Sequence, residues 1–557
     1  MKKNHKYIFV VGGVMSGVGK GIATSSIGHI LQSTGHTVNA IKIDPYLNVD
    51  AGTMNPVEHG EAFVLDAGME CDQDMGNYER FMEVTLTPDD YITSGMVYKY
   101  VIEKERALGY GGKCVEAIPH ITGEIVRRIE LSAKKSNSEI TLIEIGGTIG
   151  DYQNVLFIEA ARYLKINHPE NVLFIMVSYL PVPGTLGEMK TRPTQNAVRQ
   201  LNSYGVQPDI IIARGICPLD QRRKEKIALS CSIKPDHVIS APDIESVYDV
   251  PINFERDNIG GIILKALRLR DKNIEADMKA WKKFVSKTKN TEGELQIAVV
   301  GKYFDSGDFV FSDAYVSVIE AIKYSSYWLG RKAKLTWLNS KHIETGELKV
   351  SDLAKYDGII VPGGFGSSGI EGIISVIKYA RENKIPYLGL CYGMQLMVIE
   401  YARHLLGWKD ANTAEIDPKS SHLVIDIMPD QKAKIAAGNF GASMRLGAYP
   451  AKLKINTVAR SAYKVENISE RHRHRYEVNP EYVAALEKMG LVFSGTSPDG
   501  TLMEIAELPK TEHPFFLGTQ FHPEFKARPL NPHPLFTAFA KAVKDKNEKR
   551  RHKEQQK

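Results

Sequence analysis

Short apolar runs alternate with amphipathic stretches along the first half of the chain. The apolar runs predict buried strands at 7–11, 38–43, 140–145, 171–177 and 209–213. The amphipathic stretches predict helices at 21–33, 155–164 and 194–203. Strands that alternate with helices indicate a parallel, doubly wound sheet.

A second pattern of the same kind follows the charged stretch 271–294, which we interpret as a linker with a helical piece at 276–285. Strands are predicted at 295–300, 358–361 and 386–390, and helices at 314–327 and 394–403. At 557 residues the chain is too long for one core. We therefore expect two α/β domains, at 1–270 and 295–543, with a charged and disordered tail at 544–557.

Composition narrows the class of protein. A hydrophobic content of 43% and a net charge of +5 are ordinary for a soluble globular chain, and no apolar run is long enough to span a bilayer. The five cysteines are scattered, without CxxC spacing, which argues against a disulfide framework and against a zinc site. We expect a cytoplasmic protein that binds neither membrane nor nucleic acid.

The first predicted strand leads into a glycine-rich turn, Gly12-Gly13-Val14-Met15-Ser16-Gly17-Val18-Gly19-Lys20-Gly21. In such a turn backbone N–H groups, a helix N-terminus and a lysine converge on a phosphate. The match to a P-loop is imperfect, because Val14 stands where the first glycine is expected and Gly21 replaces the Ser/Thr that binds magnesium. A turn that binds nothing is the alternative.

If Gly21 cannot hold a metal, oxygen ligands must come from elsewhere. Asp74 and Glu144 are the candidates. Glu144 lies within an apolar strand, where an unpaired carboxylate is costly. The alternatives are a buried salt bridge for Glu144 and a solvated turn for Asp74.

The second half contains a cysteine between glycines, Gly389-Leu390-Cys391-Tyr392-Gly393, after a predicted strand and before a predicted helix. This is the pattern of a nucleophile elbow, and a helix N-terminus stabilises a thiolate. A buried, inert cysteine is the alternative. The base is expected at His522, oriented by Glu524, since residues two apart in an extended segment face the same way. Gly363-Gly364-Phe365-Gly366 offers N–H groups for an oxyanion hole.

Several strings carry a family resemblance: Lys42-Ile43-Asp44-Pro45-Tyr46-Leu47-Asn48-Val49-Asp50, Gly52-Thr53-Met54, His59-Gly60-Glu61, Ile118-Pro119-His120-Ile121-Thr122, Glu144-Ile145-Gly146-Gly147-Thr148 and Lys190-Thr191-Arg192-Pro193-Thr194-Gln195. Together with the glycine-rich turn they resemble the synthetase domain of the CTP synthase family. The resemblance runs from about residue 7 to 248 and resumes at 297.

The resemblance implies an N-terminal domain of the dethiobiotin-synthetase type that binds ATP, UTP and Mg²⁺. ATP contacts would fall on Gly17, Val18, Gly19, Lys20, Gly21, Ile22, Lys42, Asp74, Asp243 and Ile244. The metal would lie on Asp74 and Glu144. UTP, or the product CTP, would contact Ser16, Asp151, Tyr152, Gln153, Lys190, Thr191, Arg192, Pro193, Thr194, Gln195 and Lys226.

The second half resembles class I glutamine amidotransferases, whose domain is flavodoxin-like. The triad would be Cys391, His522 and Glu524. Contacts to glutamine would come from Gly364, Tyr392, Gly393, Met394, Gln395, Glu415 and Arg473. The basic string from 471 to 475 would lie beside this site instead of forming a nucleic-acid patch.

The chain departs from the family at three places. Tyr392 stands where leucine is commoner, and Gln153 replaces an acidic residue, which would alter contacts to UTP or CTP. Ser367-Ser368 replaces a Tyr-Arg pair whose arginine is tied to activation by GTP. We therefore expect weakened or altered activation by GTP.

The predicted function is ATP-dependent conversion of UTP to CTP, with ammonia released from glutamine and passed between the domains. The family also implies feedback by CTP and a homotetramer, and filaments would coexist with catalysis. The rivals are a cobyrinate-type amidotransferase and a P-loop assembly module with a degenerate glutaminase half. The string 190–195 disfavours the first, and the intact Cys391, His522 and Glu524 disfavour the second.

Overall fold

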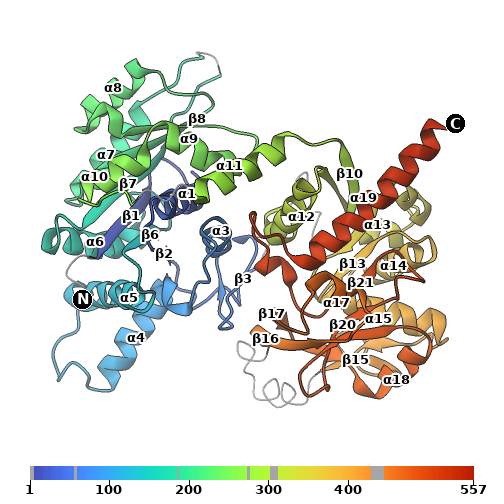
Figure 1. Ribbon diagram of the computed structural model, residues 1–557. Coiled ribbons are helices and arrows are strands. Elements are labelled where there is room, and N and C mark those ends of the chain that lie inside the picture. Colours follow the sequence, from blue (N-terminus) through green and yellow to red (C-terminus); the bar gives the residue numbers. More distant parts are fainter. Residues whose placement is uncertain are drawn as a thin grey trace. The chain divides into compact units, whose positions relative to one another are not determined.

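The computed structural model describes residues 5–55, 59–184, 187–272, 276–301, 312–427 and 444–556. The chain forms two compact units (Figure 1). The first comprises Met1–Ala51 and Asp74–Val285, and the second comprises Gly52–Gln73 and Ser286–Lys557. Each unit is built on a sheet with helices on its faces, which confirms the predicted α/β class.

Seven parallel strands form the sheet of the first unit, in the order β5-β2-β6-β1-β7-β8-β9. Their bounds are β1 (Lys6–Gly12), β2 (Val38–Asp44), β5 (Tyr91–Thr93), β6 (Ile140–Ile145), β7 (Val172–Tyr179), β8 (Ile210–Gly215) and β9 (Val238–Pro242). Every residue of β1, β2 and β6 is buried. A strand buried on both faces appears as a continuous apolar run, which is why the sequence predicted these strands well.

Alternate residues of β1 face opposite sides of this sheet. Tyr7, Phe9 and Val11 share a core with the helices α5 (Thr122–Lys135), α6 (Val155–Asn167), α7 (Arg192–Ser203) and α8 (Gln221–Cys231). The helix α1 (Lys20–Ser33) packs with α9 (Val250–Arg256) and α10 (Ile259–Ala266). The unit also contains α3 (Gln73–Met82) and α4 (Ser94–Arg106).

The stretch expected as a linker forms α11 (Ala276–Lys289), which is more than a connection. Trp281 is fully buried, its indole N–H donates to the Tyr248 carbonyl at 2.9 Å, and its ring contacts His29 of α1. Most of α11 therefore belongs to the core of the first unit. The helical piece predicted at 276–285 is therefore present, but the charged residues on its exposed face concealed the apolar stripe that packs in the first unit.

The second unit has a nine-stranded sheet in the order β11-β10-β12-β13-β21-β20-β19-β16-β17. Its bounds are β10 (Glu294–Gly301), β11 (Lys332–Asn339), β12 (Gly358–Val361), β13 (Tyr387–Leu390), β16 (Arg445–Leu453), β17 (Asn467–His474), β19 (Val492–Thr496), β20 (Met503–Glu507) and β21 (Phe516–Thr519). The pairs from β11 to β21 are parallel and those beyond β21 are antiparallel. The sequence predicted β10, β12 and β13 but not the antiparallel part. A smaller sheet joins β14 (Asn412–Thr413), β15 (Leu423–Ile427) and β18 (Tyr476–Val478).

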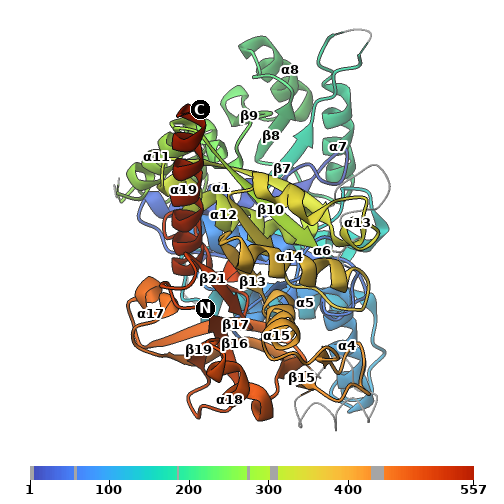
Figure 2. The ribbon, with the colours of Figure 1, turned by 90° about the vertical axis from the view of Figure 1, so that its right-hand side faces the viewer.

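Helices cover both faces of the parallel part of this sheet (Figures 1 and 2). On one face lie α12 (Val316–Trp328) and α19 (Pro534–Gln555), and on the other α14 (Ile370–Glu382) and α15 (Tyr392–Leu405). The shorter helices are α13 (Ser340–Glu344), α17 (Val458–Tyr463) and α18 (Pro480–Lys488).

The disordered tail predicted at 544–557 is wrong for the greater part of its length, because α19 continues to Gln555. Asn547 is buried and donates to the carboxylate of Asp357 at 2.7 Å, and Arg550 donates to the same group at 3.2 Å. Arg331 pairs with Glu548 at 2.9 Å. The end of α19 is therefore held by polar partners that are distant in sequence, although its composition is typical of a disordered terminus.

A segment from the first half of the chain belongs to the second unit. Residues 52–73 include the hairpin of β3 (Phe63–Val64) and β4 (Glu70–Cys71). Asp66 pairs with Arg471, and the ring of Phe63 packs against Phe525. Glu61 accepts the Ser317 N–H at 3.1 Å, which caps the N-terminus of α12. No feature of the sequence signalled this exchange.

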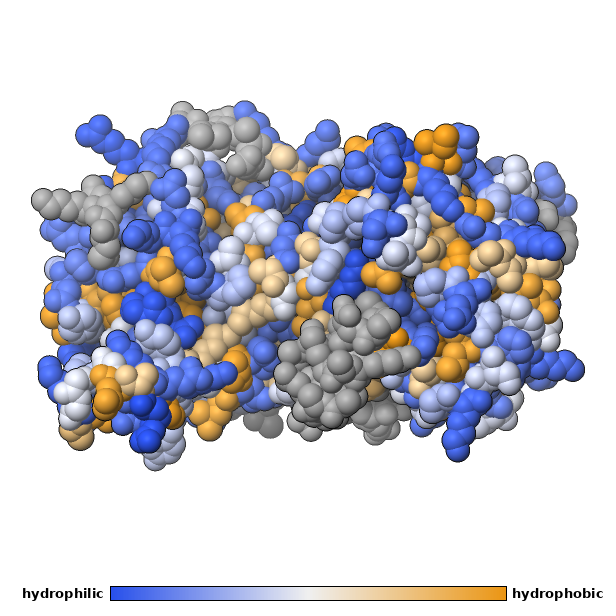
Figure 3. Space-filling model, turned by 90° about the horizontal axis from the view of Figure 1, so that it is seen from below, coloured by the Kyte–Doolittle hydropathy of each residue, from blue (hydrophilic) through white to orange (hydrophobic). Residues whose placement is uncertain are grey.

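Hydrophilic and hydrophobic residues both occur on the surface. The face shown in Figure 3 intersperses hydrophilic and hydrophobic residues. Across the described part of the chain, none of the helices combines the length and apolarity needed to cross a bilayer.

Candidate active sites

The glycine-rich turn lies between β1 and α1, as the sequence predicted. Gly17 and Gly19 have φ values of 67° and 86°, in the left-handed region that glycine tolerates. Val14 also has a positive φ, 80°, although it carries a β-branched side chain. The missing first glycine of the motif thus coincides with a strained residue, and strain of this kind gathers at functional sites.

Lys20 points back across the turn. Its Nζ donates to the Gly147 carbonyl at 2.8 Å, and the residue is 8% exposed. Burial lowers the pKa of Lys20, while the carboxylate of Glu144 acts in the opposite direction. The Lys20 amino group therefore lies between the turn and the end of β6.

Lys42, Asp74 and Glu144 meet next to this lysine. The Lys42 ammonium lies 2.5 Å from Asp74 Oδ2 and 3.0 Å from Glu144 Oε1. Glu144 also accepts the Tyr78 hydroxyl at 2.5 Å. The buried salt bridge considered for Glu144 is present, whereas the solvated turn considered for Asp74 is wrong, since Asp74 lies in the first turn of α3.

The two carboxyl groups differ in their electrostatics. Burial raises the pKa of Glu144 above its usual range in spite of Lys42. Burial acts the same way on Asp74, but there Lys42 and the Asn77 amide prevail and hold its pKa below the usual range. The two carboxyl groups beside Lys42 thus have pKa values shifted in opposite directions.

Asp74 occupies the space that Gly21 leaves. A Cβ added at Gly21 would lie 1.9 Å from Asp74 Oδ1. Gly21 stands where a P-loop has the Ser or Thr that carries magnesium. The Asp74 carboxylate therefore brings an oxygen ligand to the place where that hydroxyl would be.

A cavity of about 420 Å³ lies beside the turn. Its lining includes Gly19, Ile22, Asp243 and Ile244, four of the residues assigned to ATP from the sequence. Arg214, which the sequence analysis missed, also lines it and donates to the Val18 carbonyl at 3.2 Å and to Asp243 at 2.8 Å. The cavity thus joins the glycine-rich turn to the end of β9.

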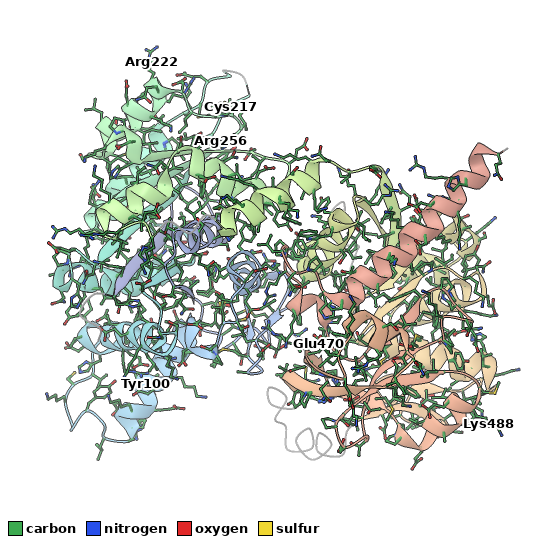
Figure 4. The ribbon with its side chains drawn as sticks, in the orientation of Figure 1. Tyr100, Cys217, Arg222, Arg256, Glu470 and Lys488 are labelled. Atoms are coloured by element: carbon green, nitrogen blue, oxygen red, sulfur yellow. The ribbon has the colours of Figure 1, made fainter. Side chains whose placement is uncertain are left out.

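A second cavity, of about 330 Å³, lies entirely within the second unit. Its lining includes Gly364, Cys391, Gln395, Glu415, Arg473, His522 and Glu524. Residues of the exchanged segment line it too, namely Gly52, Thr53, Met54, Glu61 and Ala62. All five cysteines are free, and Cys391 is the one in this cavity, whereas Cys217, labelled in Figure 4, is exposed on the first unit.

Cys391 lies in a sharp turn between β13 and α15. Its φ of 50° is in the left-handed region, and its N–H donates to the Thr519 carbonyl at 2.6 Å. A Cβ at Gly393 would lie 2.3 Å from the Val361 carbonyl oxygen, so the turn requires glycine there. Strained backbone of this kind exposes the nucleophile of an elbow.

His522 and Glu524 form a buried pair. The extended segment predicted for them is wrong, because Pro523–Lys526 form a 3-10 helix. Nδ1 of His522 lies 2.7 Å from Glu524 Oε1. Burial alone would lower the pKa of His522, but the Glu524 carboxylate and the Cys391 sulfur outweigh it and raise that pKa to about 10. The imidazole is thus prepared to hold a proton taken from the cysteine.

The turn 363–366 packs against this histidine. A Cβ at Gly363 would lie 2.8 Å from His522 Cε1, which explains the glycine. Glu415 Oε1 accepts the Gly366 N–H at 2.7 Å. The Arg473 guanidinium is held by Glu70, with 2.6 Å between Nε and Oε1.

Two family models match the chain. Residues 6–269 match the model described as CTP synthase N-terminus, and residues 310–542 match glutamine amidotransferase class-I. The CTP synthase of Pyrococcus furiosus is 49% identical over 542 residues, which cover 97% of this chain and 98% of that protein.

The chain belongs to the CTP synthase family.

A second relative has a similar degree of identity over a similar length. The CTP synthase of Caldanaerobacter subterraneus is 49% identical and covers 97% of this chain and 98% of its own length. A solved glutaminase domain of the Trypanosoma brucei CTPS, with bound acivicin, is 36% identical, covers 45% of this chain and 94% of its own, and has a TM-score of 0.42. As a member of the CTP synthase family, the chain is a ligase with a class I glutamine amidotransferase region.

The residues that the CTP synthase resemblance assigned to UTP or CTP lie on several elements of the first unit. A Cβ at Gly13 would lie 2.9 Å from the Ala197 Cβ of α7, and one at Gly147 would lie 3.0 Å from Asp151. The string 190–195 leads into α7, with Thr194 and Gln195 buried. Ser16, Tyr152 and Gln153 are exposed, as is Lys226 on α8.

Three of the residues assigned to glutamine, Tyr392, Gly393 and Met394, are buried behind the cavity and do not line it. Their backbone forms the elbow and the first turn of α15. Gln520, which the sequence analysis missed, donates from Nε2 to the Cys391 sulfur at 3.6 Å. Its position directly before Phe521-His522 was the signal that could have identified it.

Proposed function

We propose that this chain catalyses the ATP-dependent amination of UTP to CTP, with ammonia supplied by its own hydrolysis of glutamine. The observation that carries the proposal is that one chain contains two clusters of groups that suit the two half-reactions. One is the lysine and carboxylate cluster at a phosphate-binding turn, and the other is the cavity of Cys391, His522 and Glu524.

In the synthetase reaction the backbone of the glycine-rich turn and Lys20 hold the ATP phosphates. Transfer of the γ-phosphoryl group to O4 of uracil turns that oxygen into a leaving group. Ammonia then attacks C4 and phosphate leaves with the O4 oxygen. Such a transfer mainly needs positioning and neutralisation of charge, which Lys20 and Lys42 provide.

Magnesium fits the acidic pair. Asp74 and Glu144 offer carboxylate oxygens, the donors that Mg²⁺ prefers, and Asp74 fills the place of the missing P-loop hydroxyl. Within the described residues, no group of three or more acidic, histidine or cysteine side chains forms a metal cage. When bound, Mg²⁺ would supply positive charge next to the phosphates.

In the glutaminase reaction His522 takes the proton of Cys391, and the thiolate attacks the side-chain amide carbon of glutamine. The N–H of Gly364 receives the developing oxyanion, and His522 returns the proton to the departing ammonia. Water then hydrolyses the thioester. Glu415 and Arg473 carry charges opposite to those of the amino and carboxylate groups of glutamine.

Ammonia is proposed to pass to the synthetase site within the protein, which prevents its protonation in bulk water. The exchanged segment supports this proposal, because it lines the glutaminase cavity and is followed directly by Asp74. By family resemblance we also propose a homotetramer and feedback inhibition by CTP.

The test measures CTP formed from UTP, ATP and magnesium, with either glutamine or ammonium chloride as nitrogen source. Cys391→Ala should abolish the reaction with glutamine and leave that with ammonium chloride unchanged. Glutamine hydrolysis without CTP from either source would reject UTP as the substrate.

A further inference from the structure

The tyrosine that follows Cys391 contacts the turn 363–366, whose residues Gly363 and Gly364 line the cavity that contains Cys391. Its hydroxyl donates to the Gly366 carbonyl at 2.9 Å. Tyr392 is 2% exposed, and a Cβ at Gly364 would lie 3.8 Å from its ring. The side chain thus extends from the elbow to the turn 363–366 and runs alongside Gly364.

Gly366 is held from two directions. Its N–H donates to Glu415 at 2.7 Å while its carbonyl accepts from Tyr392. Its φ of 81° lies in the region open to glycine. A glycine-rich turn is conformationally permissive, so its peptide planes take a fixed orientation only when outside groups bind them. The two hydrogen bonds supply that restraint next to Gly364.

We propose that the Tyr392 hydroxyl is a positioning group that orders the turn 363–366 as an oxyanion hole. This proposal rests on the glutaminase half of the proposed function. An oxyanion hole is effective only if its donors point at the developing charge before the reaction begins. Tyr392 acts on the reaction through Gly366 and makes no contact with the reacting atoms itself.

A substitution can separate the hydrogen bond of the Tyr392 hydroxyl from the packing of its ring. Tyr392→Phe keeps the ring against Gly364 and removes only the donor to Gly366. Tyr401, in the same helix, provides a matched control, because it is 3% exposed and its hydroxyl donates to the Met489 carbonyl at 2.6 Å, away from the cavity. Tyr401→Phe therefore removes a comparable buried hydrogen bond from the same element.

The experiment measures glutamate release from glutamine by the full chain and its two variants. Removal of a whole oxyanion donor costs about 10²–10³ in kcat, so a donor left in place but poorly oriented should cost about tenfold. We expect this loss in the kcat of Tyr392→Phe with KM unchanged, and no loss in Tyr401→Phe. CTP formation from ammonium chloride should be the same in all three proteins.

A second readout tests the thiol itself. Alkylation of Cys391 by iodoacetamide, followed by mass spectrometry of its peptide, proceeds without a tetrahedral oxyanion. The rate should be equal in the wild type and Tyr392→Phe. An unchanged kcat, or alkylation that slows in parallel with hydrolysis, would overturn the proposal. A wild type that forms CTP from ammonium chloride but no glutamate from glutamine would instead refute the glutaminase half of the proposed function, and this proposal with it.

Discussion

At the scale of single residues, the glycine-rich turn between β1 and α1 shows how one side chain takes the place of another. The motif lacks the hydroxyl expected after Lys20, and the Asp74 carboxylate occupies the vacant space. The same geometry means that a Cβ at Gly21 would force the Asp74 carboxylate to move.

Gly21→Ala should therefore displace the Asp74 carboxylate. A misplacement of about 1 Å at a reacting centre can cost about 10²-fold, so CTP formation should fall by about that factor with either nitrogen source. Glutamine hydrolysis in the absence of nucleotides should be unaffected. Gly123→Ala, at a helical glycine with open space around it, is the control and should keep full activity. Equal activity of the two variants would contradict the assignment of Asp74.

The pair of His522 and Glu524 predicts a dependence of stability on pH. The pKa of His522 is raised from 6.5 to about 10, so the folded protein binds this proton more tightly than the unfolded chain. The resulting stability is fully present below about pH 6.5 and is lost as the pH rises through about 10.

Glu524→Gln removes the carboxylate that holds the proton. The difference in Tm between the wild type and this variant should be large near pH 6.5 and should narrow toward pH 10. Thermal unfolding at a series of pH values measures it. A difference that stays constant over this range would show that His522 carries no extra proton in the folded state.

At the scale of elements, α19 shows how a charged helix becomes part of a core. The carboxylate of Asp357 is fully buried and also accepts the Gln296 N–H at 2.9 Å. Asn547 and Arg550, near the end of α19, provide its remaining partners.

Truncation after Val543 should leave Asp357 as an uncompensated buried charge. Breaking a buried pair in this way costs about 3–5 kcal/mol, so the free energy of unfolding of the second unit should fall by that order. Denaturant titration followed by glutaminase activity measures it. Removal of only residues 551–557 retains both partners and should have little effect. If truncation after Val543 leaves the free energy of unfolding unchanged, the result would support the disordered tail that the sequence predicted.

At the scale of the whole molecule, the exchange of residues 52–73 ties the two halves of the chain together. The segment leaves the first unit after Ala51, lines the glutaminase cavity, and rejoins the first unit at Asp74. Glu70 in this segment holds Arg473, so a group assigned to glutamine is oriented by residues from the first half of the chain.

Regulation by GTP is the prediction at this scale. The family resemblance implies a Tyr-Arg pair where this chain has Ser367-Ser368. We therefore expect GTP to stimulate glutamine-dependent turnover by less than about fivefold, the lower end of ordinary allosteric coupling. Ser368→Arg should increase the stimulation. Initial rates with and without GTP measure both effects, and a strong response of the wild type would refute the expectation.

The sequence by itself determined the parts that depend on neighbouring residues. Buried parallel strands such as 140–145 appear as apolar runs, the glycine-rich turn adjoins its strand and helix, and His522 and Glu524 are two residues apart. Each of these signals lies within a few residues, so a local pattern was sufficient. The predicted limits of the two domains stay a prediction, since the compact units are not continuous in sequence.

Only the tertiary structure decided the contacts between distant positions. Asp74 fills the space beside Gly21, Tyr392 reaches Gly366, Arg214 joins Val18 to Asp243, and Asn547 satisfies Asp357. No periodic pattern or short spacing in a single sequence indicates that the residues of these pairs are in contact. These contacts form because buried polar groups need hydrogen-bond partners, and the fold supplies partners that are distant in sequence.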